Sequence, residues 1–270
     1  MAEIAKLTMT GIVKRFGGVV ALDGVDFEVR RAEVMALVGD NGAGKSTLIK
    51  TLSGAYRPDA GEIRLDGEPV RFASPQDAWA RGVATIYQEL ALAGKMPIPD
   101  NVFLGREIVR PVVGIPFLDR RAMRARTAEL LKELDVHVPS LDVWVEHLSG
   151  GQRQGVAIAR ALNIDAEIIV MDEPTAALAV AEQRKVLDFI RRLRGQGKSV
   201  ILISHNIQDV FAVSDRITAL RHGKRIGLRE TATTEPEEVV GLITGAALAR
   251  RPPMAEDPTA AEPVTTGGAT

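Results

Sequence analysis

Apolar and polar positions form two kinds of pattern along this chain. Short continuous apolar runs, such as 34–38 and 168–171, are typical of strands covered on both faces. Segments with apolar residues three and four positions apart, such as 120–135 and 180–194, predict helices. Because strands and helices alternate through the C-terminal half, the pattern predicts an α/β fold with a mostly parallel sheet. The expected strands are 7–14, 25–29, 34–38, 83–87, 168–171, 199–203 and 216–220.

The remaining segments are assigned from turn and cap residues. Asp66-Gly67 predicts a tight turn, which makes 61–71 a hairpin. Ser74-Pro75 predicts the start of a short helix, with serine as the cap and proline in the first turn. Further helices are expected after Ser149 and at 206–213. Residues 91–118 contain four prolines and no clear period, so we expect them to be irregular.

The loop that follows the apolar run 34–38 matches the phosphate-binding pattern G-x-x-x-x-G-K-S. It lies between a predicted strand and a predicted helix, which is the context that the pattern requires. Glycines let the backbone approach phosphates closely, and the helix start directs N–H groups at the anion. Lys45 would neutralise the β- and γ-phosphates, and the Ser46 hydroxyl would ligate Mg²⁺. The expected nucleotide contacts are Gly39, Asn41, Gly42, Ala43, Gly44, Lys45, Ser46 and Thr47.

Two adjacent acids, Asp172 and Glu173, end the apolar run 168–171. The carboxyl end of a central strand is where ligands bind in open α/β sheets. Asp172 suits the hydration shell of Mg²⁺, and Glu173 suits a general base for an attacking water. An exposed acidic turn is the alternative, but the phosphate loop upstream favours a site.

A second possible anion cradle lies at Ser149-Gly150-Gly151-Gln152. Serine can cap the helix that follows, and the two glycines expose its first N–H groups. An ordinary capped helix is the alternative. Because the chain has two cradles but one lysine-bearing loop, each cradle can serve a different nucleotide in a dimer.

Composition excludes several classes of protein. The 270 residues are 46% hydrophobic, enough for one large domain or two small ones. A net charge of −1 lacks the basic excess of nucleic-acid binding proteins, so no nucleic-acid partner is expected. The absence of cysteine excludes disulfides and thiolate zinc sites. No apolar run approaches the roughly 20 residues of a membrane span, so we expect a soluble chain whose membrane role would come through a partner.

Together these motifs resemble the nucleotide-binding subunit of ATP-binding cassette (ABC) transporters, from about residue 7 to 245. The run LSGGQ at 148–152 is the signature of that family, and MDEPT follows at 171–175. The resemblance implies a P-loop NTPase (RecA-like) fold with an N-terminal antiparallel β subdomain and an inserted helical subdomain. The implied domain is 5–247, with its core at 5–94 and 156–247 and the helical part at about 95–155. The tail 248–270 is expected to be disordered.

The resemblance also implies roles for three further residues. Phe16 falls where an aromatic ring stacks on adenine, and Gln88 where a glutamine contacts Mg²⁺ and relays to the membrane partner. His205 falls where a histidine contacts the γ-phosphate. The chain departs from the family at Ala179, where an aspartate usually helps to couple two sites, so that coupling is in doubt.

The segments 87–90, 101–107 and 174–178 look like those of monosaccharide importers, in a single-cassette form. The resemblance thus implies an ATPase that uses ATP and Mg²⁺, pairs with a second cassette and drives transmembrane permease subunits from the cytoplasmic face of the inner membrane. A sugar-binding protein outside the cell would be an indirect partner, and the region from Gln88 to about 118 would receive a permease helix. Which sugar is carried is not predicted.

Three other functions compete with this prediction. A soluble ABC-type ATPase acting in DNA repair or translation would carry a coiled-coil insertion or a second cassette, and neither is visible. A kinase has no need of LSGGQ, and a GTPase would have an N-K-x-D motif at a strand end. A binding module without hydrolysis would usually have lost Glu173 or His205.

Overall fold

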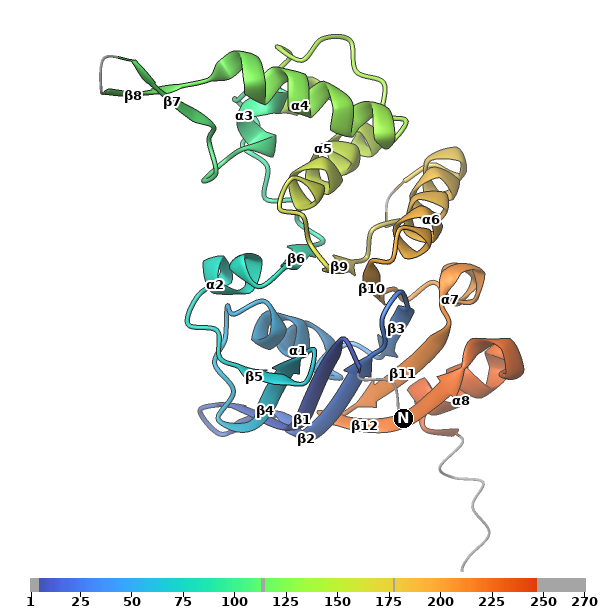
Figure 1. The fold of residues 1–270 in the computed structure, drawn as a ribbon. Coiled ribbons are helices and arrows are strands. Elements are labelled where there is room, and N and C mark those ends of the chain that lie inside the picture. The colour runs from blue at the N-terminus through green and yellow to red at the C-terminus, as the bar shows by residue number, and fades with distance from the viewer. Residues whose placement is uncertain (1–4, 113–114, 177, 247–270) are drawn as a thin grey trace, which may run out of the picture.

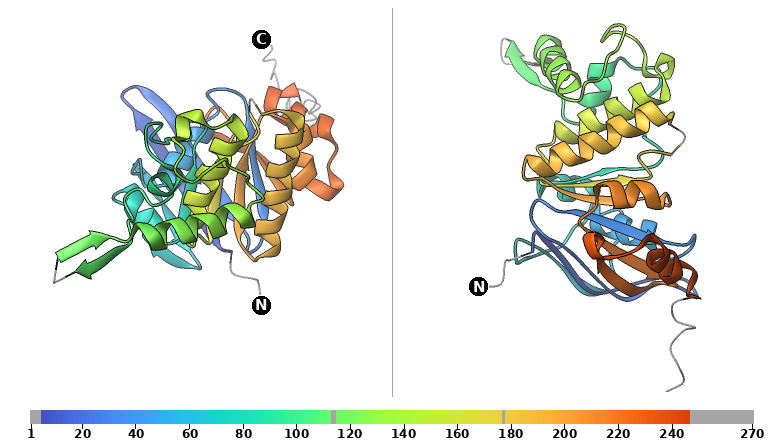
Figure 2. Two further views of the ribbon diagram at one scale, coloured as in Figure 1. Left: turned by 90° about the horizontal axis from the view of Figure 1, so that it is seen from above. Right: turned by 90° about the vertical axis from the view of Figure 1, so that its right-hand side faces the viewer.

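The computed structural model describes residues 5–112, 115–176 and 178–246. Within them the chain forms a six-stranded sheet, a four-stranded sheet and a two-stranded hairpin (Figure 1). Figure 2 shows helices above the larger sheet and the smaller sheet below it. The predicted α/β fold with a mostly parallel sheet is therefore confirmed. The tail 248–270 lies outside the described residues.

The larger sheet has the strand order β12-β11-β3-β10-β9-β6. Strands β11, β3, β10, β9 and β6 run parallel, whereas β12 pairs antiparallel with β11. The carboxyl ends of the parallel strands therefore lie along one edge. The strands are β3 (Val34–Gly39), β6 (Val83–Ile86), β9 (Ile168–Asp172), β10 (Ser199–Ile203), β11 (Arg216–Arg221) and β12 (Lys224–Glu230).

The smaller sheet is antiparallel and has the order β2-β1-β4-β5. The hairpin of β4 and β5 turns at Asp66 and Gly67, whose φ angles are 51° and 83°. This is the primed turn predicted for this pair of residues. The strands are β1 (Leu7–Phe16), β2 (Val19–Val29), β4 (Ala60–Leu65) and β5 (Glu68–Val70).

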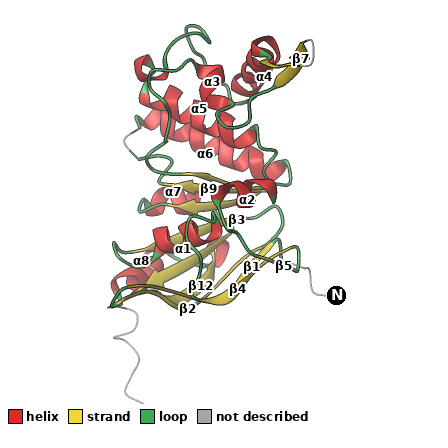
Figure 3. Cartoon of the chain, turned by 90° about the vertical axis from the view of Figure 1, so that its left-hand side faces the viewer, coloured by secondary structure: helices red, strands yellow, loops and turns green. Residues whose placement is uncertain are grey.

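Helix α1 (Lys45–Leu52) lies between the two sheets (Figure 3). Its buried residues Leu48, Ile49 and Leu52 belong to one apolar cluster with side chains of both sheets. Burial of such side chains contributes about 1.5–3 kcal/mol each, before the entropy cost of ordering them. The helix that begins at the phosphate loop is therefore held rigidly by the core.

Helices cover the other face of the larger sheet. The apolar sides of α5 and α6 pack on β6, β9 and β10, and those of α7 and α8 pack on β3 and β11. Among the helices of the described ranges, none combines the length and apolar character needed to cross a bilayer. The helices on this face are α5 (Gly150–Leu162), α6 (Val180–Gly195), α7 (Ile207–Val213) and α8 (Pro236–Thr244). Helix α2 (Pro75–Ala80) packs in the same apolar cluster as α1 instead, and short 3₁₀ turns lie at Val145–His147 and Thr231–Thr233.

The prediction that 91–118 is irregular was wrong. This stretch contains α3 (Ile98–Val102) and the hairpin of β7 (Val109–Val112) and β8 (Ile115–Leu118). The amide of Asn101 organises the first part, since it bonds the backbone of Ala93 in both directions and is fully buried. A side-chain amide that pairs with nearby backbone in this way leaves no apolar period in the sequence.

Helix α3 packs on α4 (Arg120–Glu133) and α5, and the hairpin projects beyond them (Figures 1 and 2). Helix α5 also contacts β6 of the larger sheet, and the predicted subdomain boundary at 155/156 falls inside this helix. The division into a core and a helical subdomain stays a prediction.

Candidate functional site

The phosphate loop, Asp172, Glu173 and His205 lie at the carboxyl edge of the larger sheet. Strand β3 leads into the phosphate loop, β9 ends at Asp172, and β10 ends just before Ser204 and His205. Ile203 of β10 lies opposite both Leu37 of β3 and Asp172 of β9, so these strand ends are neighbours. Strand β6, at the end of the same sheet, leads to Gln88.

The phosphate loop presents backbone N–H groups at the start of α1. Gly44 is the N-cap, and neither a side-chain cap nor an acid in the first turn occupies the helix start. Gly44 has φ of +104°, and a Cβ there would lie 2.8 Å from the carbonyl oxygen of Ala21. Glycine is therefore required at this position. An uncapped, positively polarised helix start fits a phosphate group well.

The ammonium group of Lys45 folds back over this loop. Its Nζ donates to the carbonyl oxygens of Gly39 at 2.7 Å and Asp40 at 3.1 Å. The loop therefore holds a cation next to the open N–H groups. Carbonyl oxygens are weaker partners for an ammonium than phosphate oxygens are, so an incoming triphosphate can take over these hydrogen bonds.

The two acids differ in their surroundings. Burial raises the pKa of the Asp172 carboxyl, and the adjacent Glu173 charge raises it further, while Lys45 and Lys50 lower it. Asp172 therefore lies within range of the charge on Lys45 of the phosphate loop. Among the described residues, no group of three or more His, Asp or Glu side chains is arranged to bind a metal. A single carboxylate near the phosphate loop suits Mg²⁺, which takes its other ligands from phosphates and water.

Glu173 and His205 form a contact between β9 and β10. The Nδ1 atom of His205 lies 2.8 Å from Oε2 of Glu173, whose side chain is only 12% exposed. Glu173 adopts φ of 51°, in the left-handed region, and its N–H donates to the carbonyl oxygen of Ile203 at 2.9 Å. A non-glycine residue in this region is uncommon and is often found at functional sites. The left-handed backbone conformation and the contact with His205 thus occur at the same residue.

Phe16 and Gln88 are both exposed. Phe16 ends β1 and is 43% exposed, so it does not belong to the core. Its ring packs against Tyr56 with centroids 5.2 Å apart. Exposure leaves both side chains available to a ligand or a partner, and their roles stay predictions.

The signature segment forms the predicted cap of α5. Ser149 Oγ accepts from the Gln152 N–H at 3.2 Å, and Gln152 Oε1 accepts from the Ser149 N–H at 2.9 Å. Gln152 Nε2 also donates to the carbonyl oxygen of His137 at 2.8 Å. This capping box orders the segment and leaves the N–H groups of Gly150 and Gly151 at the helix start.

Glu182 was missed by the sequence analysis. A Cβ at Gly151 would lie 2.4 Å from its Oε1 atom, so this carboxylate packs against the signature glycine. The only signal for Glu182 in the sequence is that it stands three residues after the helix-capping position Ala179, where an acid of the first helical turn is common. An acid here is attracted by the same helix start that a phosphate would use.

The two cradles lie apart within one chain. Helix α1 is between the sheets, whereas the start of α5 belongs to the helical part above them (Figures 1 and 3). The structure thus brings together the phosphate loop, Asp172, Glu173 and His205, but not the signature segment. Ala177, in the loop after Glu173, lies outside the described residues.

Ala179 is the N-cap of α6 and makes no capping hydrogen bond, although its φ of −64° and ψ of 153° suit a cap. We therefore expect Ala179→Asp to stabilise the protein by about 1 kcal/mol, because the carboxylate can accept from the first-turn N–H groups. The midpoint of thermal unfolding should rise by about 2–4 °C. Ala181→Asp, inside the same turn, is the matched control, and an equal rise in both variants would contradict a capping effect.

The chain is similar to known proteins over most of its length. The ABC transporter family model matches residues 22–176. The fructose import ATP-binding protein FrcA of Rhizobium meliloti is 48% identical, covering 91% of this chain and 96% of the relative. The xylose/arabinose import ATP-binding protein XylG of Sulfolobus acidocaldarius is 46% identical, covering 90% and 96%. The ribose import ATP-binding protein RbsA 1 of Streptomyces avermitilis is 45% identical over 92% of this chain, which spans 46% of that relative.

Solved structures show the same fold. An ATP-binding cassette of an ABC transporter has a TM-score of 0.76 at 26% identity, covering 91% of this chain and 97% of the other. A dimeric cassette in a post-hydrolysis state, bound to ADP and Pi, has a TM-score of 0.72 at 25% identity, covering 83% and 98%. The chain therefore belongs to the ABC transporter family, as one of its ATP-binding cassettes.

Proposed function

We propose that this cassette is the ATP-hydrolysing motor of an importer for a monosaccharide. The names of FrcA, XylG and RbsA 1 support a simple sugar as cargo, since each is a sugar import ATP-binding protein. The motor would act at the cytoplasmic face of the membrane, bound to transmembrane permease subunits. A sugar-binding protein on the other side would deliver the cargo to those subunits.

The phosphate loop would bind the triphosphate of ATP. Lys45 would leave its two carbonyl partners and pair with the β- and γ-phosphates, while the N–H groups from Gly42 to Thr47 donate to their oxygens. Ser46, Asp172 and Gln88 would hold Mg²⁺, which neutralises charge on the transferred phosphoryl group.

Glu173 would activate water for the reaction. Its carboxylate accepts a proton as the water oxygen bonds to the γ-phosphorus, and the bond from the γ-phosphorus to the bridging oxygen breaks to leave ADP. His205 orients this carboxylate through the 2.8 Å contact. The other face of the imidazole would remain available to the γ-phosphate, since the side chain is 76% exposed.

Two copies would complete each site. The signature cradle of one copy would cover the γ-phosphate held by the phosphate loop of the other, because the two cradles do not meet in one chain. The dimeric cassette bound to ADP and Pi is a precedent for the assembly. Loss of the γ-phosphate removes the bridge, so the copies separate and the movement reaches the permease through the segment from Gln88 to 118.

The observation that carries this proposal is the Glu173–His205 contact beside the phosphate loop, since a binding module would not need it. A soluble ABC-type ATPase without a transport role is the alternative. The test is reconstitution of the chain with a permease pair in vesicles, measuring uptake of ribose, xylose and fructose with ATP turnover. Uptake that requires ATP supports the importer, and turnover without uptake of any monosaccharide favours the alternative.

The same vesicles test the shared site through Ser149→Arg. The arginine would place a bulky cation at the signature cradle without touching the phosphate loop of its own chain. We expect ATP binding to persist and turnover and uptake to be lost. Dimer closure with ATP in this variant would contradict the shared site.

A further inference from the structure

The loop after α1 connects the helix of the phosphate loop to the end of β1 in the smaller sheet, which is called the tip below. This loop, 53–59, starts where α1 ends and returns to the end of β1, next to Phe16. The N–H of Asp59 donates to the carbonyl oxygen of Val13 at 2.8 Å. Its carboxylate accepts from the N–H of Arg15 at 2.6 Å and from Nζ of Lys14 at 3.0 Å. Asp59 thus holds the three residues that precede Phe16.

Tyr56 contacts Phe16 itself. The two rings have centroids 5.2 Å apart and an interplanar angle of 68°, the edge-to-face geometry that aromatic pairs prefer. Lys14 Nζ lies 5.5 Å from the centre of the Phe16 ring, and Lys50 Nζ lies 5.6 Å from the centre of the Tyr56 ring. The tyrosine restricts the orientation of an otherwise exposed phenylalanine.

The other end of the loop is anchored independently of the tip. Tyr56 N–H donates to the carbonyl oxygen of Lys50 at 2.9 Å, in the last turn of α1. At Gly54, where φ is +75°, a Cβ would lie 2.4 Å from the carbonyl oxygen of Ser74. Only glycine allows this close approach, so the loop leaves α1 in a defined direction.

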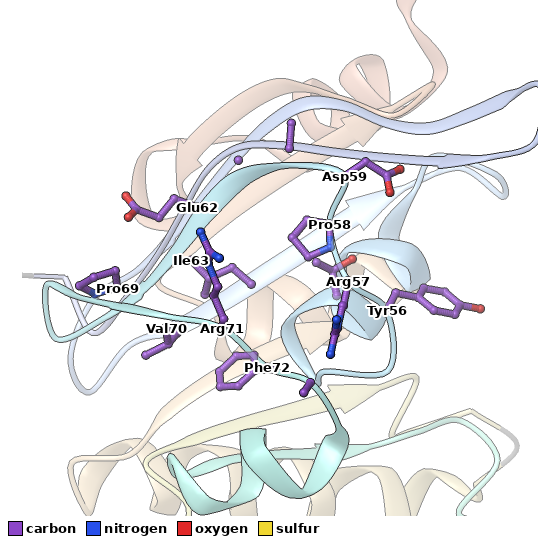
Figure 4. Close-up of a pocket in the computed structure, with 14 residues that line it drawn as sticks. Tyr56, Arg57, Pro58, Asp59, Glu62, Ile63, Pro69, Val70, Arg71 and Phe72 are labelled. Atoms are coloured by element: carbon purple, nitrogen blue, oxygen red, sulfur yellow. The ribbon is translucent and has the colours of Figure 1, made fainter.

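One side of the loop faces open space. A cavity of about 1010 Å³ lies between the loop and the β4–β5 hairpin. In Figure 4, Tyr56 and Asp59 extend to one side and Arg57 extends in another direction. The loop is therefore held by its hydrogen bonds to α1 and to β1.

We propose that Tyr56 and Asp59 are positioning residues that hold Phe16 in place for the base of the bound nucleotide. The inference rests on the proposed contact of Phe16 with adenine, and it adds a second layer behind that ring. Helix α1 carries Lys45 at one end and this loop at the other. One rigid helix therefore sets the distance between Lys45, which binds the phosphates, and Phe16, which contacts the base.

The charge of Asp59 supports this arrangement. The hydrogen bond from the Arg15 N–H lowers the pKa of the Asp59 carboxyl, and the hydrogen bond and charge of Lys14 lower it further. The group is therefore ionised at neutral pH, and its charge-assisted hydrogen bonds are present when nucleotide binds.

The test compares two ligands, ATP and inorganic triphosphate, which has no base. Both are titrated by calorimetry in EDTA, so that no turnover occurs. We expect Tyr56→Ala to weaken ATP binding about three- to tenfold and to leave triphosphate binding within twofold of wild type. Tyr56→Phe keeps the ring and should bind both ligands as wild type does. Arg57→Ala, the neighbour that extends away, is the matched control and should change neither.

A double-mutant cycle with Phe16→Ala separates the two proposals. If Tyr56 acts through Phe16, the double variant should bind ATP no more weakly than Phe16→Ala alone. Asp59→Ala should behave in the same way, which keeps the test valid if Tyr56→Ala fails to fold. If Tyr56→Ala and Asp59→Ala weakened the binding of ATP and of triphosphate equally, the proposal that they position Phe16 would be overturned.

Two outcomes locate a failure. If Phe16→Ala weakens ATP binding but Tyr56→Ala and Asp59→Ala do not, the positioning inference is wrong and the adenine contact stands. If Phe16→Ala changes ATP binding no more than triphosphate binding, the adenine contact itself is wrong and the inference falls with it.

Discussion

Lys45→Ala should lower ATP turnover at least about a hundredfold, the loss seen when one preorganised donor to a developing negative charge is removed. Lys45 is the cation of the phosphate loop, and its ammonium lies 2.7 Å from the Gly39 carbonyl oxygen at the start of that loop. No other side chain can supply this charge inside the loop. We also expect ATP affinity to fall strongly, because the β- and γ-phosphates lose their counter-charge.

Turnover is measured by phosphate release at saturating ATP, and affinity by calorimetry. Lys132→Ala is the matched control, since Lys132 is exposed on α4, far along the chain from the loop. It removes the same charge and should retain full activity. Normal turnover by Lys45→Ala would contradict the phosphate-loop assignment.

Glu173→Gln should bind ATP and stall before hydrolysis. Glutamine keeps the size and a hydrogen bond to His205, but it cannot accept a proton from water. Loss of a general base typically costs a hundredfold to ten-thousandfold in rate, so turnover should fall by about that factor. Because the γ-phosphate is retained, a dimer closed around ATP should accumulate.

Gel filtration with and without ATP measures the dimer, and phosphate release measures turnover. Glu129→Gln, on the exposed side of α4, is the matched control and should turn over ATP and separate as wild type does. Wild-type turnover by Glu173→Gln would remove Glu173 as the base. A monomer that hydrolyses slowly but never dimerises with ATP would contradict closure around the nucleotide.

The buried strands and the phosphate loop were predictable from local sequence. Mostly apolar runs such as 34–38 and 199–203 are too short for a helix and lie next to turn residues. Their length and their continuous apolar character therefore both indicate a strand. Glycines and a lysine in this pattern, placed directly after a strand, indicate a phosphate-binding loop. The cap at Ser149 was predictable because Gln152 stands three residues later.

Other features are local in the sequence but depend on pairing that patterns of residue type do not reveal. Strand β12 has an exposed, charged composition and forms because β11 pairs with it. The fold of 91–118 depends on one buried amide, Asn101, and on a hairpin whose two prolines face each other across the strands. Neither produces a repeating apolar pattern.

The sequence by itself determined the family, the pattern of the phosphate loop and most of the buried strands and amphipathic helices, since each depends on short-range patterns of residue type. Only the tertiary structure decided that Glu173 contacts His205, that Glu182 packs against Gly151 and that the ring of Tyr56 packs against Phe16. The physical reason is that parallel pairing and core packing bring together strand ends and loops that no local rule connects.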